Sequence, residues 1–171
     1  MNVPCRSMQA AAPDRPSRVS KMDIDRDAPA TAQGEIQITA SPETVWAVMA
    51  DLRGWPTWHA DVKSMDVDGR LEPGTTFRWK SGSASLVSTL QAVEEPREIG
   101  WTGKTMGIHA VHVFTFEPMD GGTHARSAES FRGLIPSIFR QYSRNVLQRG
   151  IDGMLRSLKA EAERRSAAAN A

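Results

Sequence analysis

The chain has 171 residues, with 21 lysine and arginine residues against 20 aspartate and glutamate residues and a formal net charge of +1. This balance gives no support for nucleic acid as a partner, because no basic run interleaves with aromatic residues. The single cysteine, Cys5, excludes an internal disulfide and favours a reducing, cytoplasmic location. No apolar run reaches the roughly 18 residues of a membrane span, so no stable membrane insertion is expected.

The N-terminal region differs in composition from the rest of the chain. Residues 1–33 are rich in Pro, Ala, Asp and Arg and have no hydrophobic periodicity, so we predict a disordered tail there. Met8 and Met22 are alternative starts of the chain. One folded domain is expected over residues 34–165, followed by a frayed C-terminal tail over residues 166–171.

The predicted domain starts with a strand and a helix. Alternating residues over Glu35–Thr39 predict a short strand. Ser41 and Pro42 are typical of a helix N-cap and first helical position. The helix continues to Gly54 with an apolar face of Val45, Val48, Met49 and Leu52, and an aromatic turn or short second helix follows over Trp55–Trp58.

A series of strands separated by turn residues occupies the middle of the chain. The turns contain Gly and Pro, and Asp120-Gly121-Gly122 is a strong signal for a hairpin. The predicted strands are Val62–Val67, Thr75–Lys80, Ala84–Val93, Glu98–Gly103, Gly107–Glu117 and Thr123–Arg132.

The last long stretch, Pro136–Arg165, has apolar residues at helical spacing and predicts an amphipathic helix that the strands must receive. Its apolar residues form two faces. The first contains Ile138, Phe139, Tyr142 and Val146, and the second contains Leu147, Ile151, Met154, Leu155 and Leu158. The first face continues to Gly150 and Gly153, whose presence indicates either a kink or close backbone packing, or space left for a ligand.

Together these elements predict an α+β fold, in which a curved antiparallel sheet of about seven strands wraps around the long C-terminal helix. Several short segments, and the order in which they follow one another along the chain, resemble the START-like (SRPBCC) superfamily. More narrowly, they resemble its polyketide cyclase/dehydrase and lipid transport branch. The resemblance covers about residues 34–165 and implies a helix-grip fold with a hydrophobic pocket. The matching segments are Ser41–Trp46, Trp55–Trp58, Phe77–Trp79, Val93–Pro96, Trp101–Gly103, Gly121–Thr123 and Glu129–Gly133, with Asp51 and Gly74.

The last two strands carry the candidate chemistry. If the Asp120-Gly121-Gly122 turn sets the register, His112 lies opposite Ser127 or Glu129 on the core face. An imidazole and a carboxyl group would then meet inside an apolar cavity and could act as an acid/base pair. The alternatives are a polar pair that only anchors the sheet or a ligand, or a pairing of Glu129 with Arg132 or Arg140.

Metal and cofactor chemistry are not expected. His109 and His112 point to opposite faces of one strand, and no cluster of Asp, Glu and His has ligand spacing. His59 follows an aromatic turn, where a surface histidine is expected. Trp79, Trp101 and Tyr142 fit either the core or the wall of a pocket for a planar ligand.

Two functions fit this sequence. The first is binding of a small hydrophobic ligand, such as a lipid, a quinone or a polyketide-like molecule, between the sheet and the C-terminal helix. The second is a cyclase or dehydratase that uses Glu129 and His112, and a regulator of the same superfamily is a further alternative. The predicted ligand-binding residues are Phe77, Trp79, Leu90, Trp101, His112, Phe114, Glu129, Phe131, Tyr142, Val146 and Gly150. The sequence leaves the oligomeric state open.

Overall fold

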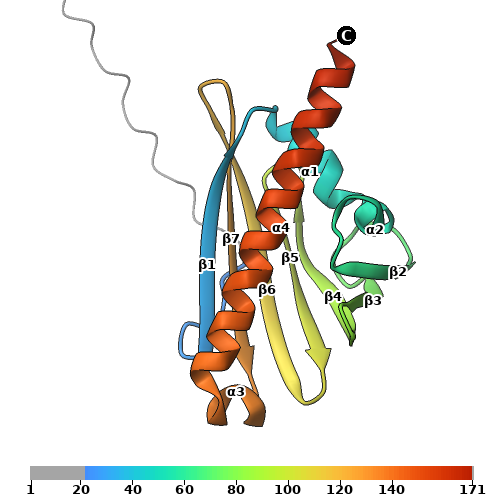
Figure 1. The fold of residues 1–171 in the computed structure, drawn as a ribbon. Helices are drawn as coiled ribbons and strands as arrows, with labels where there is room; N and C mark the ends of the chain where they lie inside the picture. Colours follow the sequence, from blue (N-terminus) through green and yellow to red (C-terminus); the bar gives the residue numbers. More distant parts are fainter. Residues whose placement is uncertain (1–21, 171) are drawn as a thin grey trace, which may run out of the picture.

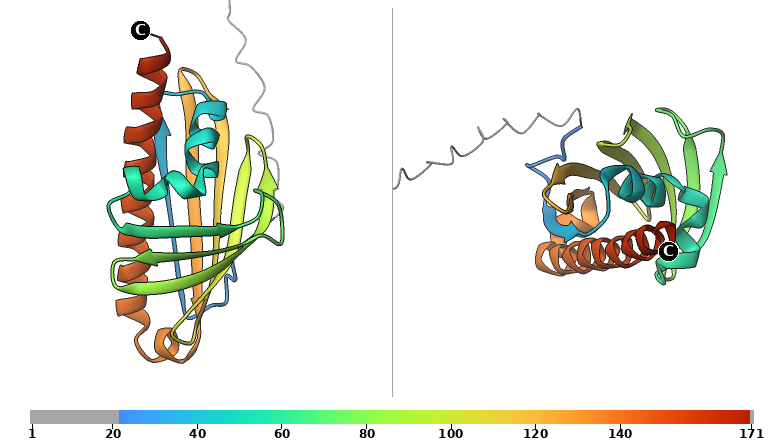
Figure 2. Two further views of the ribbon diagram at one scale, coloured as in Figure 1. Left: turned by 90° about the vertical axis from the view of Figure 1, so that its right-hand side faces the viewer. Right: turned by 90° about the horizontal axis from the view of Figure 1, so that it is seen from above.

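The computed structural model describes residues 22–170. Its seven strands form one antiparallel sheet in the order β1-β7-β6-β5-β4-β3-β2, which curves around one long helix (Figures 1 and 2). The predicted α+β helix-grip fold is therefore confirmed. The strands are β1 (Ala30–Ile38), β2 (Val62–Asp68), β3 (Thr76–Ser81), β4 (Ala84–Glu94), β5 (Glu98–Thr105), β6 (Ile108–Met119) and β7 (Gly122–Arg132).

The helices lie on the concave side of this sheet. Ser41 caps the first of them by accepting a hydrogen bond from the backbone N–H of Thr44. They are α1 (Pro42–Ala50), α2 (Trp55–Trp58), α3 (Leu134–Ile138) and α4 (Arg140–Ala169), with a 3₁₀ turn over Leu52–Gly54. Within residues 22–170, no helix combines the length and apolar content needed to cross a membrane.

The first strand starts at Ala30 and not at the predicted Glu35. Its inward residues there are small because α4 packs closely on this strand: a Cβ atom on Gly34 would lie 2.9 Å from Ile151 Cγ2. Small residues give no hydrophobic alternation, which is why this part resembles a tail. Residues 22–29 also contact the sheet, with the N–H of Met22 donating to Glu98 Oε1 at 2.9 Å. The rest of the predicted tail, residues 1–21, lies outside the described residues.

The C-terminal helix also differs from its prediction. It is interrupted at Phe139, whose backbone angles (φ −109°, ψ 52°) are not helical, so α3 and α4 are separate. At its other end α4 continues to Ala169, so residues 166–169 of the predicted frayed tail are helical. Alanine at positions 167–169 has the highest intrinsic helix propensity and supports this extension.

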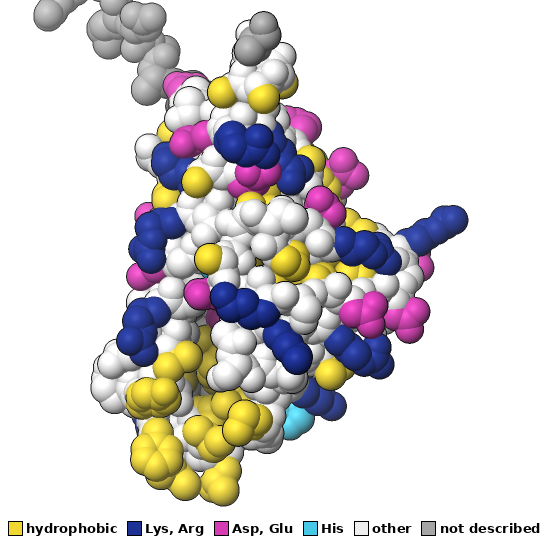
Figure 3. Space-filling view, turned by 45° about the vertical axis from the view of Figure 1, so that its right-hand side comes forward, with side chains coloured by type: hydrophobic (Ala, Val, Ile, Leu, Met, Phe, Trp, Pro, Cys, Tyr) yellow, Lys and Arg dark blue, Asp and Glu magenta, His cyan; other side chains and the backbone are white. Residues whose placement is uncertain are grey.

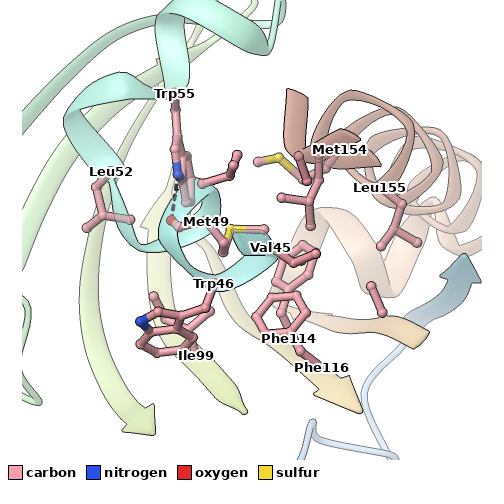
Figure 4. Packing of buried hydrophobic residues seen from close by; sticks show 14 of the residues in the cluster. Val45, Trp46, Met49, Leu52, Trp55, Ile99, Phe114, Phe116, Met154 and Leu155 are labelled. Atoms are coloured by element: carbon pink, nitrogen blue, oxygen red, sulfur yellow. Dashed lines mark hydrogen bonds between the residues drawn. The ribbon is translucent and has the colours of Figure 1, made fainter. Parts of the chain in front are cut away.

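The core lies between the sheet, α1 and α4. Figure 4 shows Val45 and Met49 of α1 and Met154 and Leu155 of α4 pointing toward the sheet side chains. The second predicted face of the C-terminal helix is confirmed as its core face, since Leu147, Ile151, Met154, Leu155 and Leu158 are all buried. Trp55 lies at the centre of an aromatic group, with ring centroids 5.5 Å from Trp101, 5.9 Å from Trp79 and 6.3 Å from Phe77.

The first predicted apolar face of that helix does not pack against the strands. Phe139 and Tyr142 remain 59% and 66% exposed, and Ile138 is exposed as well. These residues lie at the end of the molecule formed by α3 and the start of α4, beyond the part of the helix that packs on the sheet (Figures 1 and 3).

Candidate functional site

A polar group of three side chains lies on the inner face of the β6–β7 ladder. His112 stands directly opposite Glu129, one of the two partners that the hairpin turn predicts. The two side chains approach to 3.4 Å between His112 Nδ1 and Glu129 Oε1. The other ring nitrogen, Nε2, lies 2.8 Å from Ser127 Oγ. Both nitrogens of the imidazole therefore have a polar neighbour, and both neighbours come from β7.

The turn between β6 and β7 fixes this register. Asp120 and Gly121 form a two-residue connection between Met119 and Gly122, and Gly121 adopts a positive φ of 79° that glycine tolerates without strain. Because side chains alternate along a strand, Ser127 and Glu129 must then share the face of His112. A shift by one residue would turn all three side chains toward the outer face.

Aromatic side chains enclose the imidazole. The His112 ring lies 4.8 Å from the Trp101 ring and 4.6 Å from the Phe114 ring, measured between centroids. Trp101 is the cross-strand neighbour of His112 on β5. This apolar surrounding removes water from the imidazole and leaves Ser127 and Glu129 as its polar neighbours within 3.5 Å.

Burial controls the ionisation of the pair. It lowers the pKa of His112 from 6.5 to about 3, and it raises the pKa of Glu129 from 4.5 to about 8. At neutral pH both side chains are therefore uncharged. A neutral imidazole that donates from Nε2 to Ser127 can accept at Nδ1 from the protonated carboxyl of Glu129, so one tautomer suits both neighbours.

Glu129 is also the member of this group that is most accessible, with 15% of its side chain exposed. Trp79 and Phe131, which share the inner face, are likewise only partly buried. Across from the sheet, a Cβ atom on Gly150 of α4 would meet no atom within 4 Å. Gly150 is exposed, so this position opens to solvent, and its predicted role in ligand binding stays a prediction.

The remaining predicted ligand-binding residues fall into two groups. Phe77, Leu90, Trp101 and Phe114 are fully enclosed in the core, where they support the inner face. Tyr142 and Val146 are 66% and 37% exposed on the surface of α4, which corrects the expectation that the strands cover them. The reason is their position on α4: the adjacent residues Ser143 and Leu147 are buried, so Tyr142 and Val146 lie on the face that turns away from the core.

Two buried polar groups at the aromatic turn are not revealed by the sequence. His59 is buried and not a surface histidine, because its Nδ1 atom lies 3.0 Å from Ser157 Oγ on α4. The indole N–H of Trp58 is buried and has no hydrogen-bond partner among the described residues. An unpaired buried donor is unusual in proteins and is a candidate partner for a bound water or ligand.

Other candidate chemistry is not assembled. In the described part of the chain, no three His, Cys, Asp or Glu residues gather as metal ligands. Arg132 binds Asp25, with its Nε atom 2.7 Å from Oδ2, and so does not serve as the partner of Glu129. A separate hollow of about 840 Å³ lies over the outer face of β1, β6 and β7, lined in part by the charged residues Asp23, Arg26, Glu35 and Arg126.

An antiparallel sheet closed around a C-terminal helix, with a polar group on its inner face, defines a START-like helix-grip protein. The chain belongs to the polyketide cyclase/dehydrase and lipid transport family, whose model matches residues 29–163. No curated protein matches the chain.

Solved structures with this fold include enzymes and proteins of unassigned function. A hypothetical protein from Helicobacter pylori superposes with a TM-score of 0.74 and 16% identity, over 90% of this chain and 99% of that one. A START superfamily protein from Mycobacterium smegmatis superposes with a TM-score of 0.69 and 13% identity, over 78% of this chain and 97% of that one. An aromatase/cyclase from Streptomyces superposes with a TM-score of 0.70 and 17% identity, over 79% of this chain and 94% of that one. At these identities the likeness shows the fold alone.

Proposed function

We propose that this protein binds a small hydrophobic molecule, a lipid, a quinone or a polyketide-like compound, between the inner face of the sheet and the first half of α4. The observation that carries the proposal is the Ser127–His112–Glu129 group set in an aromatic wall, with 15% of the Glu129 side chain exposed. Apolar ligand surface buried there would contribute about 25 cal/mol per Å² to binding.

The polar group suits recognition of one oxygen on such a ligand. With its pKa raised to about 8, the Glu129 carboxyl is protonated at neutral pH and can donate a hydrogen bond to a carbonyl or hydroxyl oxygen. Because the carboxyl carries one proton, His112 then takes its other tautomer, in which the Nδ1–H group can donate to the remaining carboxyl oxygen and Nε2 accepts from Ser127. Membership of a family described as polyketide cyclase/dehydrase and lipid transport supports a ligand of this kind.

The second candidate function is a cyclase or dehydratase, favoured by the direct contact of an acid with an imidazole. In this reading, Glu129 delivers a proton to a substrate oxygen and His112 receives one. A pKa of about 3 makes His112 a weak base near neutral pH, however, because efficient proton acceptors have a pKa near the working pH. Binding is therefore the better supported function.

Native mass spectrometry of the purified full chain tests the proposal. We expect a small molecule that remains with the folded protein and is released when it unfolds. The Glu129→Gln variant separates the two functions, since it keeps the shape of the protonated carboxyl but cannot transfer its proton. Retained binding with loss of a turnover supports the enzyme, and weakened binding without any turnover supports the carrier. A Glu129→Gln protein with unchanged binding and unchanged activity would exclude Glu129 from the site.

A further inference from the structure

The end of the molecule formed by α3, the start of α4 and the β5–β6 turn is strongly apolar and exposed. We define this apolar tip by Met106, Leu134, Ile135, Ile138, Phe139, Tyr142 and Val146, all of which are exposed large hydrophobic residues. Met106 and Leu134 are 80% and 73% exposed. Figure 3 shows these apolar side chains gathered at one end of the molecule, next to a surface that carries Lys and Arg.

The backbone holds the tip together as one surface. Gly133, at the start of α3, lies so close to the β5–β6 turn that a Cβ atom on it would be 2.3 Å from the carbonyl oxygen of Gly107. Its φ of +140° also disfavours any side chain. The turn that carries Met106 is thus fixed beside α3. Scattered single apolar residues are normal on protein surfaces, but a contiguous set of this kind indicates an interaction site.

Charge distinguishes the possible partners of the tip. Between Glu129 and Asp152 the chain contains no acidic residue, while it contains Arg132, Arg140, Arg144 and Arg149. Arg140 and Arg144 form no salt bridge with any residue in the range 22–170. At the other end of α4 the cations are neutralised instead, as Arg164 and Arg165 both pair with Glu161 and Lys159 pairs with Glu163.

We infer that the apolar tip docks on an anionic lipid surface. Phe139, Ile138 and Leu134 would enter the boundary between headgroups and acyl chains, Tyr142 would lie at the headgroup level, and the arginines would contact the phosphates. This is shallow, reversible binding at the interface and is consistent with the lack of a spanning helix among the described residues. A second copy of the chain is disfavoured as the partner, because a symmetric contact would bring the unpaired arginines of two tips together.

The docking also orients the molecule. Phe131, at the end of β7, belongs to the inner face and precedes Gly133 and α3 directly in the chain. The end of the inner face that carries Phe131 and Glu129 therefore lies toward the apolar tip. A protein that docks by this end brings the Phe131 end of its inner face close to the lipid surface.

Vesicle sedimentation of the full chain tests the inference. We expect binding to vesicles that contain phosphatidylglycerol, weak binding to pure phosphatidylcholine, and loss of binding as salt is raised. Phe139→Ser and Leu134→Ser should each reduce the partition coefficient about ten-fold, since each removes a large apolar side chain from the lipid. The matched control is Met119→Ser, which removes an exposed apolar side chain from the β6–β7 turn at the opposite end of the sheet.

The charge contribution has its own control. Arg144→Gln should weaken binding about five-fold, which corresponds to one cation near an anionic surface. Arg97→Gln removes the same charge from the β4–β5 turn and should leave binding unchanged. Unchanged thermal unfolding shows that each exposed variant is folded.

Absence of binding to the anionic vesicles overturns the inference, and so does binding that the tip variants do not alter. A wild-type dimer in light scattering that Phe139→Ser converts to a monomer would assign the tip to a second copy and overturn it as well. Vesicle binding is measured without any small molecule, so its failure leaves the proposed ligand binding untouched.

Discussion

Glu129 of β7 stands directly opposite His112 of β6, with its Oε1 atom 3.4 Å from the Nδ1 atom of the imidazole. Desolvation in an apolar wall disfavours the charged form of each ionisable group, so both groups become neutral. The pair therefore keeps hydrogen-bonding capacity on the inner face without the cost of a buried charge. The proposed ligand binding depends on this property.

The stability of the protein should depend on pH through this pair. The pKa of Glu129 rises from 4.5 in the unfolded chain to about 8 in the folded one, so its contribution is complete below 4.5 and is lost as pH rises toward 8. The pKa of His112 falls from 6.5 to about 3, so its contribution is complete above 6.5 and is lost as pH falls toward 3. Between 6.5 and 8 only the Glu129 effect operates.

Urea unfolding at pH 6.5 and pH 8 measures this effect. We expect the wild-type free energy of unfolding to fall by up to about 2 kcal/mol over this interval, at 1.36 kcal/mol per unit of pH. Glu129→Gln should remove the dependence, whereas Glu72→Gln, a change at an exposed turn carboxyl, should preserve it. A dependence that survives in Glu129→Gln would contradict the assignment.

Gly150 of α4 and Gly34 of β1 should respond oppositely to substitution by alanine. Gly150→Ala adds a methyl group where no atom lies within 4 Å, so the better helix propensity of alanine should stabilise the protein by about 0.5–1 kcal/mol. Gly34→Ala places its methyl group 2.9 Å from Ile151 Cγ2 and 3.2 Å from Leu155 Cδ1, and should destabilise it by about 1–3 kcal/mol. Thermal unfolding measures both. A destabilising Gly150→Ala would mean that the space beside α4 is filled.

The tryptophans of the aromatic turn make a similar matched pair. The indole N–H of Trp55 donates to the carbonyl oxygen of Met49 at 2.9 Å, whereas the indole N–H of Trp58 has no partner among the described residues. Trp55→Phe and Trp58→Phe remove the same atoms, but only the first leaves a buried carbonyl without its donor. We expect Trp55→Phe to cost about 1–3 kcal/mol more in chemical unfolding. Equal costs would show that Trp58 is also hydrogen-bonded in solution.

The sequence predicts the strands and the candidate pair well because both depend on local signals. Gly and Pro mark the turns, and the Asp120-Gly121-Gly122 turn sets the register that joins His112 to Glu129. Alternation then determines which residues share the inner face. The catalytic and ligand-binding roles of these residues stay predictions.

The parts that sequence reasoning missed depend on contacts between distant segments. The early start of β1 is hidden because close packing on α4 requires small residues there, which look like a tail. The buried state of His59 depends on Ser157, 98 residues away. The exposure of Tyr142 follows from which face of α4 packs on the core, since the adjacent Ser143 is buried instead, and the hydrophobic periodicity of the helix does not reveal this.

The most direct test of ligand binding is NMR of the tryptophan indole N–H signals, assigned by Trp→Phe variants, during titration with emodin, a small polyketide-like anthraquinone. We predict saturable shifts of the Trp79 and Trp101 signals, because both side chains lie on the inner face and Trp101 contacts His112. The signal of Trp46, which packs on Phe116 farther along β6, should remain unchanged. Emodin binding that leaves the Trp79 and Trp101 signals unshifted would contradict the proposed binding site.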